Sequence, residues 1–242
     1  MRKTILVTGG TGFIGSHTCL VLVEKNFKII VIDSNVNSTD LCLNSIKKFF
    51  KKNNSLIPDI FFSKGDIRDR IFLEKVFSKA LKNGCPIEGV IHFAGLKSVE
   101  ESVKDPLNYW DNNVLGTLNL LKVMEKYYCK TIVFSSSATI YGSNNINPIK
   151  EDYEINPINP YGHTKASVEY MLEGIYKSNK EEWRIANLRY FNPIGAHESG
   201  FIGEDPINKP NNLFPYICSV AKGKYEKLNI FGKDWPTLDG TG

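Results

Sequence analysis

A tyrosine and a lysine lie four positions apart in the stretch NPYGHTKAS, which begins at Asn159. Four positions are about one helical turn, so Tyr161 and Lys165 would share one face of a helix, with Cβ atoms roughly 6 Å apart. A free phenol has a pKa near 10, and a nearby cation can lower that value by about 1 to 3 units. The pair could therefore supply a catalytic base, although an isolated Y-x-x-x-K is more commonly a surface pair.

A second stretch with chemically meaningful spacing is TGGTGFIGSH, which follows the apolar run TILVT. Gly10, Gly12 and Gly15 fit G-x-G-x-x-G, and Gly9 with Gly12 and Gly15 fits G-x-x-G-x-x-G. Between a strand and a helix, glycines permit a tight turn and bring backbone amides close to a pyrophosphate, whose charge the helix N-terminus favours. The stretch predicts a dinucleotide-binding site.

The apolar run KIIVID ends at Asp33. A carboxylate at this position can accept hydrogen bonds from the adenosine ribose diol of NAD, and it would repel the 2′-phosphate of NADP. We therefore expect NAD as the cofactor, and the alternative is that Asp33 only begins an Asx-type turn. Asp66 and Ile67, after the third apolar run, could border the adenine, although an acidic turn residue explains Asp66 nearly as well.

Six apolar runs alternate with longer segments of helical spacing, and this alternation predicts an α/β fold with a Rossmann-like doubly wound parallel sheet. The expected strands cover residues 4–8, 28–33, 60–63, 89–94, 131–136 and 185–191. Because parallel strands end at one edge of the sheet, the glycine-rich turn, the stretch HFAGLKSVEES, the serines 135–137 and Tyr161 should converge on one crevice. In that setting Tyr161 is the expected acid/base, Lys165 its tuner, and one serine a hydrogen-bond partner of the substrate.

Two features of these runs have a structural alternative. Ser135, Ser136 and Ser137 could form only a hydroxyl-rich turn. His92 lies inside an apolar run, and we interpret it as a core histidine.

The sequence changes character after residue 190, where glycine, proline and asparagine precede one short helical piece and one strand-like run. We expect an NAD-binding domain over residues 1–190 and a partial substrate-binding lobe over residues 191–242. The last residues, DWPTLDGTG, contain no closing helix or strand.

The composition excludes several classes of protein. The chain has 242 residues, 42% hydrophobic and 23% charged, which is typical of a globular protein. A four-residue apolar run near the start is too short for a signal-peptide core, and no segment approaches about 20 apolar residues, so we expect a cytoplasmic protein without membrane association. The five scattered cysteines lack a C-x-x-C pair, so no metal site is expected, and the formal charge of +4 does not indicate nucleic-acid binding.

The motifs together resemble the extended short-chain dehydrogenases/reductases and, among them, the UDP-glucose 4-epimerase family. The resemblance covers essentially the whole chain and lies in the stretches FAGLKSVEESV, YWDNNVLGT, FSSSATIYG, NPYGHTKAS, LRYFNPIGAH, GEDP, PNNLFPYI and DGTG. Because the family's sequence runs on beyond this point, the resemblance implies that the chain is truncated at its C-terminal end.

The resemblance also implies roles for individual residues. The catalytic residues would be Ser137, Tyr161 and Lys165, with Ser137, Tyr161, Asn192, Asn212 and Leu213 on the substrate side. The NAD contacts would be Gly9, Gly10, Gly12, Phe13, Ile14, Gly15, Asp33, Asp66, Ile67, Phe93, Ala94, Gly95, Lys97, Asn112, Tyr161, Lys165 and Phe191.

The implied reaction is redox-neutral epimerisation of a UDP-sugar. Ionised Tyr161 would take the proton of the sugar 4-hydroxyl while hydride passes from C4 to NAD. The 4-ketose would then rotate in the pocket, and hydride would return to the opposite face of C4. Ser137 would bond the 4-oxygen, and Lys165 would stabilise the phenolate. The family also implies a homodimer formed through the helices around residues 101–127 and 160–178.

Three alternatives stay open. A nucleotide-sugar 4,6-dehydratase would need Asp-Glu after its serine or threonine, whereas Ala138 and Thr139 follow Ser137 here. Epimerisation of a related UDP-sugar is compatible with the same motifs. A non-catalytic NAD-sensing module could share the fold, although the presence of Ser137, Tyr161 and Lys165 together favours an enzyme.

Overall fold

The computed structural model describes residues 2–53, 58–143, 148–207, 210, 212–230, 232, 234–235 and 238–240. The chain forms two compact units, Met1–Gly203 and Glu204–Gly242. The domain boundary that we expect after residue 190 stays a prediction.

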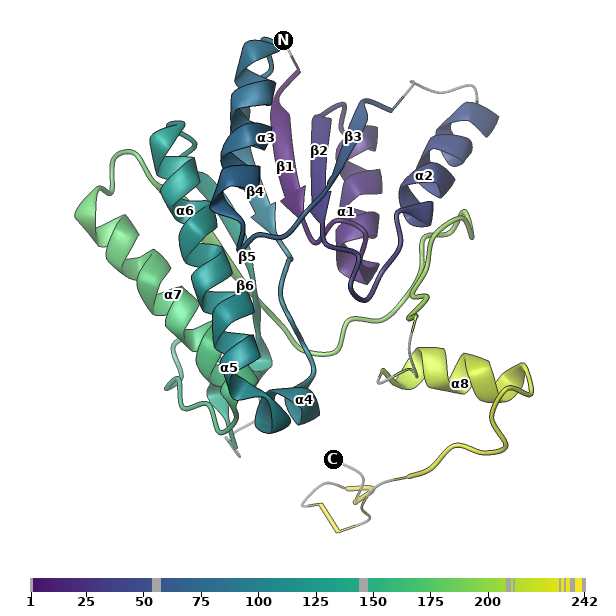
Figure 1. Cartoon of the computed structure of the whole chain (residues 1–242). Coiled ribbons are helices and arrows are strands. Elements are labelled where there is room, and N and C mark those ends of the chain that lie inside the picture. Colours follow the sequence, from purple (N-terminus) through teal and green to yellow (C-terminus); the bar gives the residue numbers. More distant parts are fainter. Residues whose placement is uncertain are drawn as a thin grey trace. The chain divides into compact units, whose positions relative to one another are not determined.

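The first unit is built on one parallel sheet of six strands in the order β3-β2-β1-β4-β5-β6 (Figure 1). The predicted Rossmann-like sheet is therefore confirmed, with β4 beginning earlier in the chain than expected. Strand order reverses between β1 and β4, and the carboxyl ends of these two strands are where open α/β sheets bind ligands. The strands are β1 (Thr4–Thr8), β2 (Lys28–Asp33), β3 (Ile60–Lys64), β4 (Ile87–His92), β5 (Thr131–Ser137) and β6 (Arg184–Tyr190).

Helices cover both faces of this sheet (Figure 1). In the first unit they are α1 (Phe13–Glu24), α2 (Leu41–Lys52), α3 (Arg70–Lys82), α4 (Val99–Lys104), α5 (Pro106–Tyr109), the π-helical turn η1 (Trp110–Leu115), α6 (Gly116–Lys126), the 3-10 turn η2 (Ala138–Tyr141) and α7 (Pro160–Ser178). The second unit contains α8 (Leu213–Ala221).

The start of α7 follows from two neighbouring residues. The side chain of Asn159 accepts a hydrogen bond from the backbone N–H of Gly162 at 2.8 Å, and Pro160 occupies the first helical position. Asparagine is a preferred N-cap, and proline fits the first turn because its missing N–H would have no partner inside the helix. Tyr161 is therefore held in the first turn of α7, as the Y-x-x-x-K spacing predicts.

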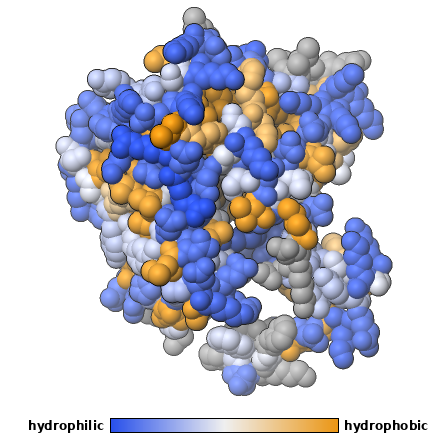
Figure 2. Space-filling model, in the orientation of Figure 1, coloured by the Kyte–Doolittle hydropathy of each residue, from blue (hydrophilic) through white to orange (hydrophobic). Residues whose placement is uncertain are grey.

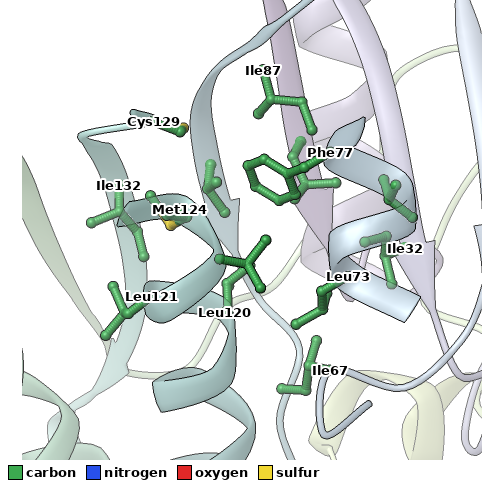
Figure 3. Packing of buried hydrophobic residues seen from close by; sticks show 14 of the residues in the cluster. Ile32, Ile67, Leu73, Phe77, Ile87, Leu120, Leu121, Met124, Cys129 and Ile132 are labelled. Atoms are coloured by element: carbon green, nitrogen blue, oxygen red, sulfur yellow. The ribbon is translucent and has the colours of Figure 1, made fainter. Parts of the chain in front are cut away.

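The hydrophobic core has two main parts because neighbouring residues of a strand point to opposite faces. Leu6 of β1 belongs to a cluster formed with α3, α6 and α7, whereas Val7 belongs to a cluster formed with α1 and α2. Figure 3 shows the first cluster, in which Leu73 and Phe77 lie near Leu120. Among the described residues, none of the helices combines the length and apolar character needed to cross a membrane.

Candidate active site

Close backbone contacts shape the turn between β1 and α1. Gly9 has a φ of +66°, and a Cβ there would lie 2.5 Å from the backbone nitrogen of Ala94. A Cβ on Gly10 would lie 2.6 Å from Val31 Cγ1, and one on Gly15 would lie 2.2 Å from the carbonyl oxygen of Gly9. Carbon contacts are normally about 3.5–4.0 Å, so the packing of this turn excludes side chains at all three positions.

Gly12 differs from the other glycines of the turn. A Cβ there would meet only the carbonyl oxygen of Gly9, at 3.4 Å, so internal packing tolerates a side chain. Gly12 is also the N-cap of α1, and it offers no side chain to the amides of the first turn. The absence of a side chain therefore leaves the N-terminus of α1 open to an anion, which fits the pyrophosphate of a dinucleotide.

Asp33 lies buried at the end of β2, beside the glycine turn. Its carboxylate accepts hydrogen bonds from the backbone N–H of Thr11 at 3.1 Å, the backbone N–H of Asn35 at 2.9 Å and the hydroxyl of Ser38 at 3.4 Å. The bond from Asn35 forms the Asx-type turn that the alternative interpretation expects. A carboxylate has about four acceptor sites, so these bonds leave room for a ribose hydroxyl.

Asp66 and Ile67 have structural partners of their own. Arg68 forms ion pairs with Asp66 at 2.7 Å and with Asp111 at 2.8 Å, and its guanidinium lowers the pKa of Asp66. Ile67 is buried against Gly116, where a Cβ would lie 2.7 Å from Ile67 Cδ1. These contacts match the alternative in which Asp66 is an acidic turn residue, and the roles of both residues at the adenine stay predictions.

The loop after β4 is held by Asn113, a residue that no sequence motif singled out. Asn113 lies buried in η1, where its side chain accepts a hydrogen bond from the N–H of Leu96 at 2.8 Å and donates to the carbonyl of Leu96 at 3.0 Å. It also donates to the hydroxyl of Thr164 at 3.1 Å, and that hydroxyl donates to the carbonyl of Tyr161 at 2.7 Å. Asn113 therefore connects this loop to the first turn of α7.

The predicted cofactor residues around Asn113 lie on this same loop and helix. Phe93, Ala94 and Gly95 are half-buried, Lys97 is exposed, and Asn112 is half-buried next to Asn113. The backbone N–H of Ala94 donates to Thr8 Oγ1 at 3.3 Å, which ties the loop to the end of β1. Their contacts with a cofactor stay predictions.

His92 is a core histidine, as predicted. It is fully buried, with Nδ1 2.6 Å from Thr8 Oγ1 and Nε2 2.8 Å from Thr117 Oγ1. Burial, with a smaller contribution from the Lys165 cation, lowers the pKa of His92 to about 3. The imidazole is therefore neutral at physiological pH.

Ser137 and Tyr161 meet at the carboxyl end of β5, and both side chains are buried. Ser137 Oγ accepts hydrogen bonds from the N–H of Thr139 at 3.2 Å and from its hydroxyl at 2.9 Å. Its own proton is then available to the phenol of Tyr161, and this hydrogen bond lowers the pKa of Tyr161. A donor beside the phenol oxygen stabilises the phenolate that a base requires.

Lys165 is buried one helical turn further along α7. Its ammonium donates to the carbonyl of Ser135 at 2.8 Å and lies 5.8 Å from the centroid of the Tyr161 ring. A Cβ on Gly95 would lie 3.6 Å from Lys165 Nζ, so the lysine also faces the loop after β4. Burial lowers the pKa of Lys165 to about 8.

The pKa of Tyr161 differs in direction from the sequence-based expectation. Burial raises it, and the opposing hydrogen bond from Ser137 is the smaller effect. The expected lowering by Lys165 is not seen, because the lysine directs its hydrogen bond to Ser135 rather than to the phenol. Tyr161 is therefore predominantly protonated at neutral pH in this geometry.

A buried ion pair lies next to these residues. Glu169 of α7 accepts a hydrogen bond from the hydroxyl of Ser136 and pairs with Arg189 of β6 at 2.8 Å. Arg189 also donates to Tyr141 Oη at 2.7 Å. Ser135 thus contacts Lys165, Ser136 contacts Glu169 and Ser137 contacts Tyr161. These contacts join three consecutive serines of β5 to three successive turns of α7 and fix the register between strand and helix.

The remaining predicted residues follow β6 or belong to the second unit. Phe191 is 61% exposed, and Asn192 is exposed beside it. Asn212 precedes α8 and donates a hydrogen bond to Glu204, and Leu213 begins α8 with its side chain exposed. The roles of these four residues at a substrate or cofactor stay predictions.

Comparison with known proteins identifies the family. A family model described as GDP-mannose 4,6 dehydratase matches residues 6–241. UDP-glucose 4-epimerase of Bacillus subtilis is 50% identical over 238 residues, which cover 98% of this chain and 67% of that protein. UDP-glucose 4-epimerase 2 of Arabidopsis thaliana is 48% identical over 242 residues, which cover 100% of this chain and 67% of that protein. The chain belongs to the UDP-glucose 4-epimerase family.

A solved member of the epimerase family shares the fold. The crystal structure of UDP-glucose 4-epimerase from Bifidobacterium longum in complex with NAD+ and UDP matches with a TM-score of 0.91 at 43% sequence identity. The match covers 99% of this chain and 68% of that one. The chain thus spans about two thirds of the length of these epimerases. The family resemblance expected from the sequence motifs is confirmed.

Proposed function

We propose that this protein interconverts UDP-glucose and UDP-galactose with NAD as its cofactor. The observation that carries the proposal is the buried group of Ser137, Tyr161 and Lys165 at the same sheet edge as the glycine turn and Asp33. Membership of the UDP-glucose 4-epimerase family supports both the substrate and the cofactor.

The residues of this chain fit NAD. Gly12 leaves the N-terminus of α1 open for the pyrophosphate, and Asp33 holds a carboxylate beside that turn for the ribose. A negative charge at Asp33 also disfavours the 2′-phosphate of NADP. Lys165 Nζ lies beside Gly95 of the loop after β4 and would bind the nicotinamide ribose.

The side chains of the buried group have distinct roles in the proposed reaction. In its ionised form Tyr161 takes the proton of the sugar 4-hydroxyl and later returns it, and Ser137 would turn its single proton from the phenol to the same sugar oxygen. The Lys165 ammonium lies 5.8 Å from the centroid of the Tyr161 ring, and it would favour the ionised phenol once its hydrogen bond moves from the carbonyl of Ser135 toward the phenol oxygen. When bound, NAD supplies reversible hydride acceptance at C4 of the sugar.

Dehydration is the less favoured chemistry, although the matching family model carries a dehydratase description. Elimination of water would need a further acid/base pair next to the serine. Ala138 and Thr139 occupy those positions, and Thr139 uses both its N–H and its hydroxyl to bond Ser137. Epimerisation needs neither group to carry a proton, so it fits the observed contacts better.

We further propose that two copies associate through the helices around residues 101–127 and 160–178. Several large apolar side chains on these helices are exposed, among them Val103 at 62%, Leu107 at 79% and Tyr170 at 55%. Figure 2 shows hydrophobic patches on the side where Figure 1 places α6 and α7. Burial of such side chains against a second copy would stabilise a dimer.

A cytoplasmic location is also proposed. The cysteines Cys19, Cys42, Cys85, Cys129 and Cys218 are all free thiols. Free thiols without disulfides are typical of a reducing compartment.

Turnover of UDP-galactose, with fluorescence titration of NAD and NADP, tests the proposed function. Tyr161→Phe removes the phenol oxygen and should lower kcat by about 100-fold or more, with NAD affinity nearly unchanged. Tyr128→Phe is the matched control, because Tyr128 is 87% exposed and should tolerate the change. Full turnover by Tyr161→Phe would show that the base is wrongly assigned, and equal affinity for NAD and NADP would overturn the role of Asp33.

A further inference from the structure

Residues 191–203, called here the crossing segment, connect the sheet edge at β6 to the opposite half of the first unit. In Figure 1 the segment runs from the end of β6 past α1 to the neighbourhood of α2. Three strand spacings separate β6 from β1 in the sheet order, or about 14 Å. The seven residues from Phe191 to His197 span at most about 25 Å, so they are long enough to cross the carboxyl ends of β5 and β4 and reach α1.

One end of the crossing segment is attached to α1 through His17. The backbone N–H of His197 donates to His17 Nε2 at 3.2 Å, so this ring nitrogen carries no proton. The proton therefore resides on Nδ1, which donates to the carbonyl of Phe13 at 2.7 Å. His17 thus connects the crossing segment to the first turn of α1, where the proposed pyrophosphate site lies.

Aromatic packing on α2 holds the same end of the segment. The ring of Phe49 lies 5.4 Å from the ring of His197 and 5.9 Å from that of Phe201. Ile202 is 6% exposed and belongs to the cluster formed by α1, α2 and the sheet. By contrast, residues 191–196 are exposed, so the segment is fixed at both ends and unsupported where it crosses the sheet edge.

We propose that His17 is a positioning residue that holds the crossing segment over the cofactor crevice and slows the release of NAD. The inference rests on the proposed function, because it requires NAD between the segment and the carboxyl ends of the strands. The segment begins at Phe191, a predicted NAD contact, and its attachment to α1 limits how far it can move away. Loss of the acceptor at His17 removes one of the contacts that hold that end and leaves the packing on α2 to hold it alone.

The test measures the rate at which bound NAD leaves the protein, with an excess of a dehydrogenase and its alcohol substrate to convert released NAD to NADH. His17→Phe keeps a ring beside Phe13 but cannot accept a hydrogen bond, and it should release NAD about 2- to 10-fold faster. His17→Gln supplies an oxygen acceptor and should restore release to within about twofold of the wild-type rate.

Two further variants separate this role from general damage to α1. Thr18→Val removes a hydroxyl that donates to the carbonyl of Ile14 at 2.9 Å, and it should leave NAD release unchanged. Phe49→Leu loosens the packing from α2 and should speed release even if His17→Phe folds poorly.

The outcomes distinguish the inference from the proposed function. Normal NAD binding with wild-type release rates in His17→Phe and Phe49→Leu would overturn the inference alone. Release by His17→Gln as fast as by His17→Phe would also overturn it, because the acceptor would then be irrelevant. A wild-type protein that binds no NAD would overturn the proposed function and this inference with it.

Discussion

At the scale of single residues, burial determines the charge of the groups around the proposed catalytic site. It raises the pKa of Tyr161, lowers that of Lys165 to about 8 and lowers that of His92 to about 3. Each shift favours the neutral form, as desolvation requires. Residue spacing predicted which of these side chains would gather, but not the direction of the Tyr161 shift, because that direction depends on burial in the folded protein.

The contribution of Asn113 also lay beyond the sequence. Two asparagines are adjacent in YWDNNVLGT, and the family resemblance pointed to Asn112. Only the π-helical turn shows that Asn113 faces inward and bonds Leu96 and Thr164. Such turns occur mostly inside longer helices and frequently at functional sites, and helical periodicity does not reveal them.

Buried His92 should make stability dependent on pH. Its pKa is about 3 in the folded protein and about 6.5 in an unfolded chain, so the stability it contributes is present above pH 6.5 and is lost as the pH falls toward 3. His92→Gln disturbs the hydrogen bonds to Thr8 and Thr117, so it should lower the free energy of unfolding at pH 7. Because glutamine does not titrate, the variant should also reduce the decline of that free energy between pH 6.5 and 4 by up to about 1.4 kcal/mol per pH unit.

Urea unfolding at several pH values measures this effect. His163→Gln serves as the control, because His163 is exposed on α7 and should leave the wild-type pH dependence intact. The same slope in His92→Gln and in the wild type would rule out the assigned pKa.

At the scale of secondary-structure elements, polar contacts between β5 and α7 set the geometry of the site. The strands were predictable because continuous apolar runs mark buried parallel strands, and the start of α7 was predictable from Asn159 and Pro160. The pairing of Glu169 with Arg189 could not be predicted from the sequence, because the two residues lie twenty positions apart on different elements. Only the fold brings α7 and β6 together around Ser136.

Removal of Arg189 should destabilise this arrangement strongly. Arg189→Met leaves the buried carboxylate of Glu169 without its cation, and breaking such a pair costs about 3–5 kcal/mol of the free energy of unfolding. Lys177→Met is the matched control, since it breaks the exposed Glu173–Lys177 pair and should cost less than about 1 kcal/mol.

Denaturant unfolding of the two variants compares the pairs directly. The double variant Arg189→Met with Glu169→Gln should recover part of the loss, because no unpaired charge then stays buried. Equal costs for Arg189→Met and Lys177→Met would contradict the structural role of the ion pair.

At the scale of the whole molecule, the family and the sheet could be predicted from the sequence because the motifs extend over nearly all of the chain. The domain boundary after residue 190 and the roles of Asn212 and Leu213 stay predictions, because a change in amino-acid composition does not define where one folded unit ends and the next begins. Association of two copies depends on surface shape as well as on apolar content, and sequence patterns report only the latter.

The proposed homodimer can be tested by light scattering across micromolar concentrations. The wild-type protein should show about twice the 27.3 kDa mass of one chain, because exposed apolar side chains of α4 to α7 become buried. Leu107→Glu combined with Val103→Glu should shift the mass toward one chain, whereas Leu41→Glu on α2 should not. A monomer mass for the wild type at every concentration would contradict the proposal.

The central claim is that hydride leaves C4 of the sugar and returns to the same carbon, while Tyr161 accepts the proton of the 4-hydroxyl and later returns it. It is tested most directly with UDP-galactose deuterated at C4, by mass spectrometry and NMR of the UDP-glucose formed. We predict that the product retains deuterium at C4 without net formation of NADH, and that Tyr161→Phe forms little labelled product. Product that has exchanged its C4 deuterium for solvent hydrogen, or labelled product formed equally fast by Tyr161→Phe, would contradict the account.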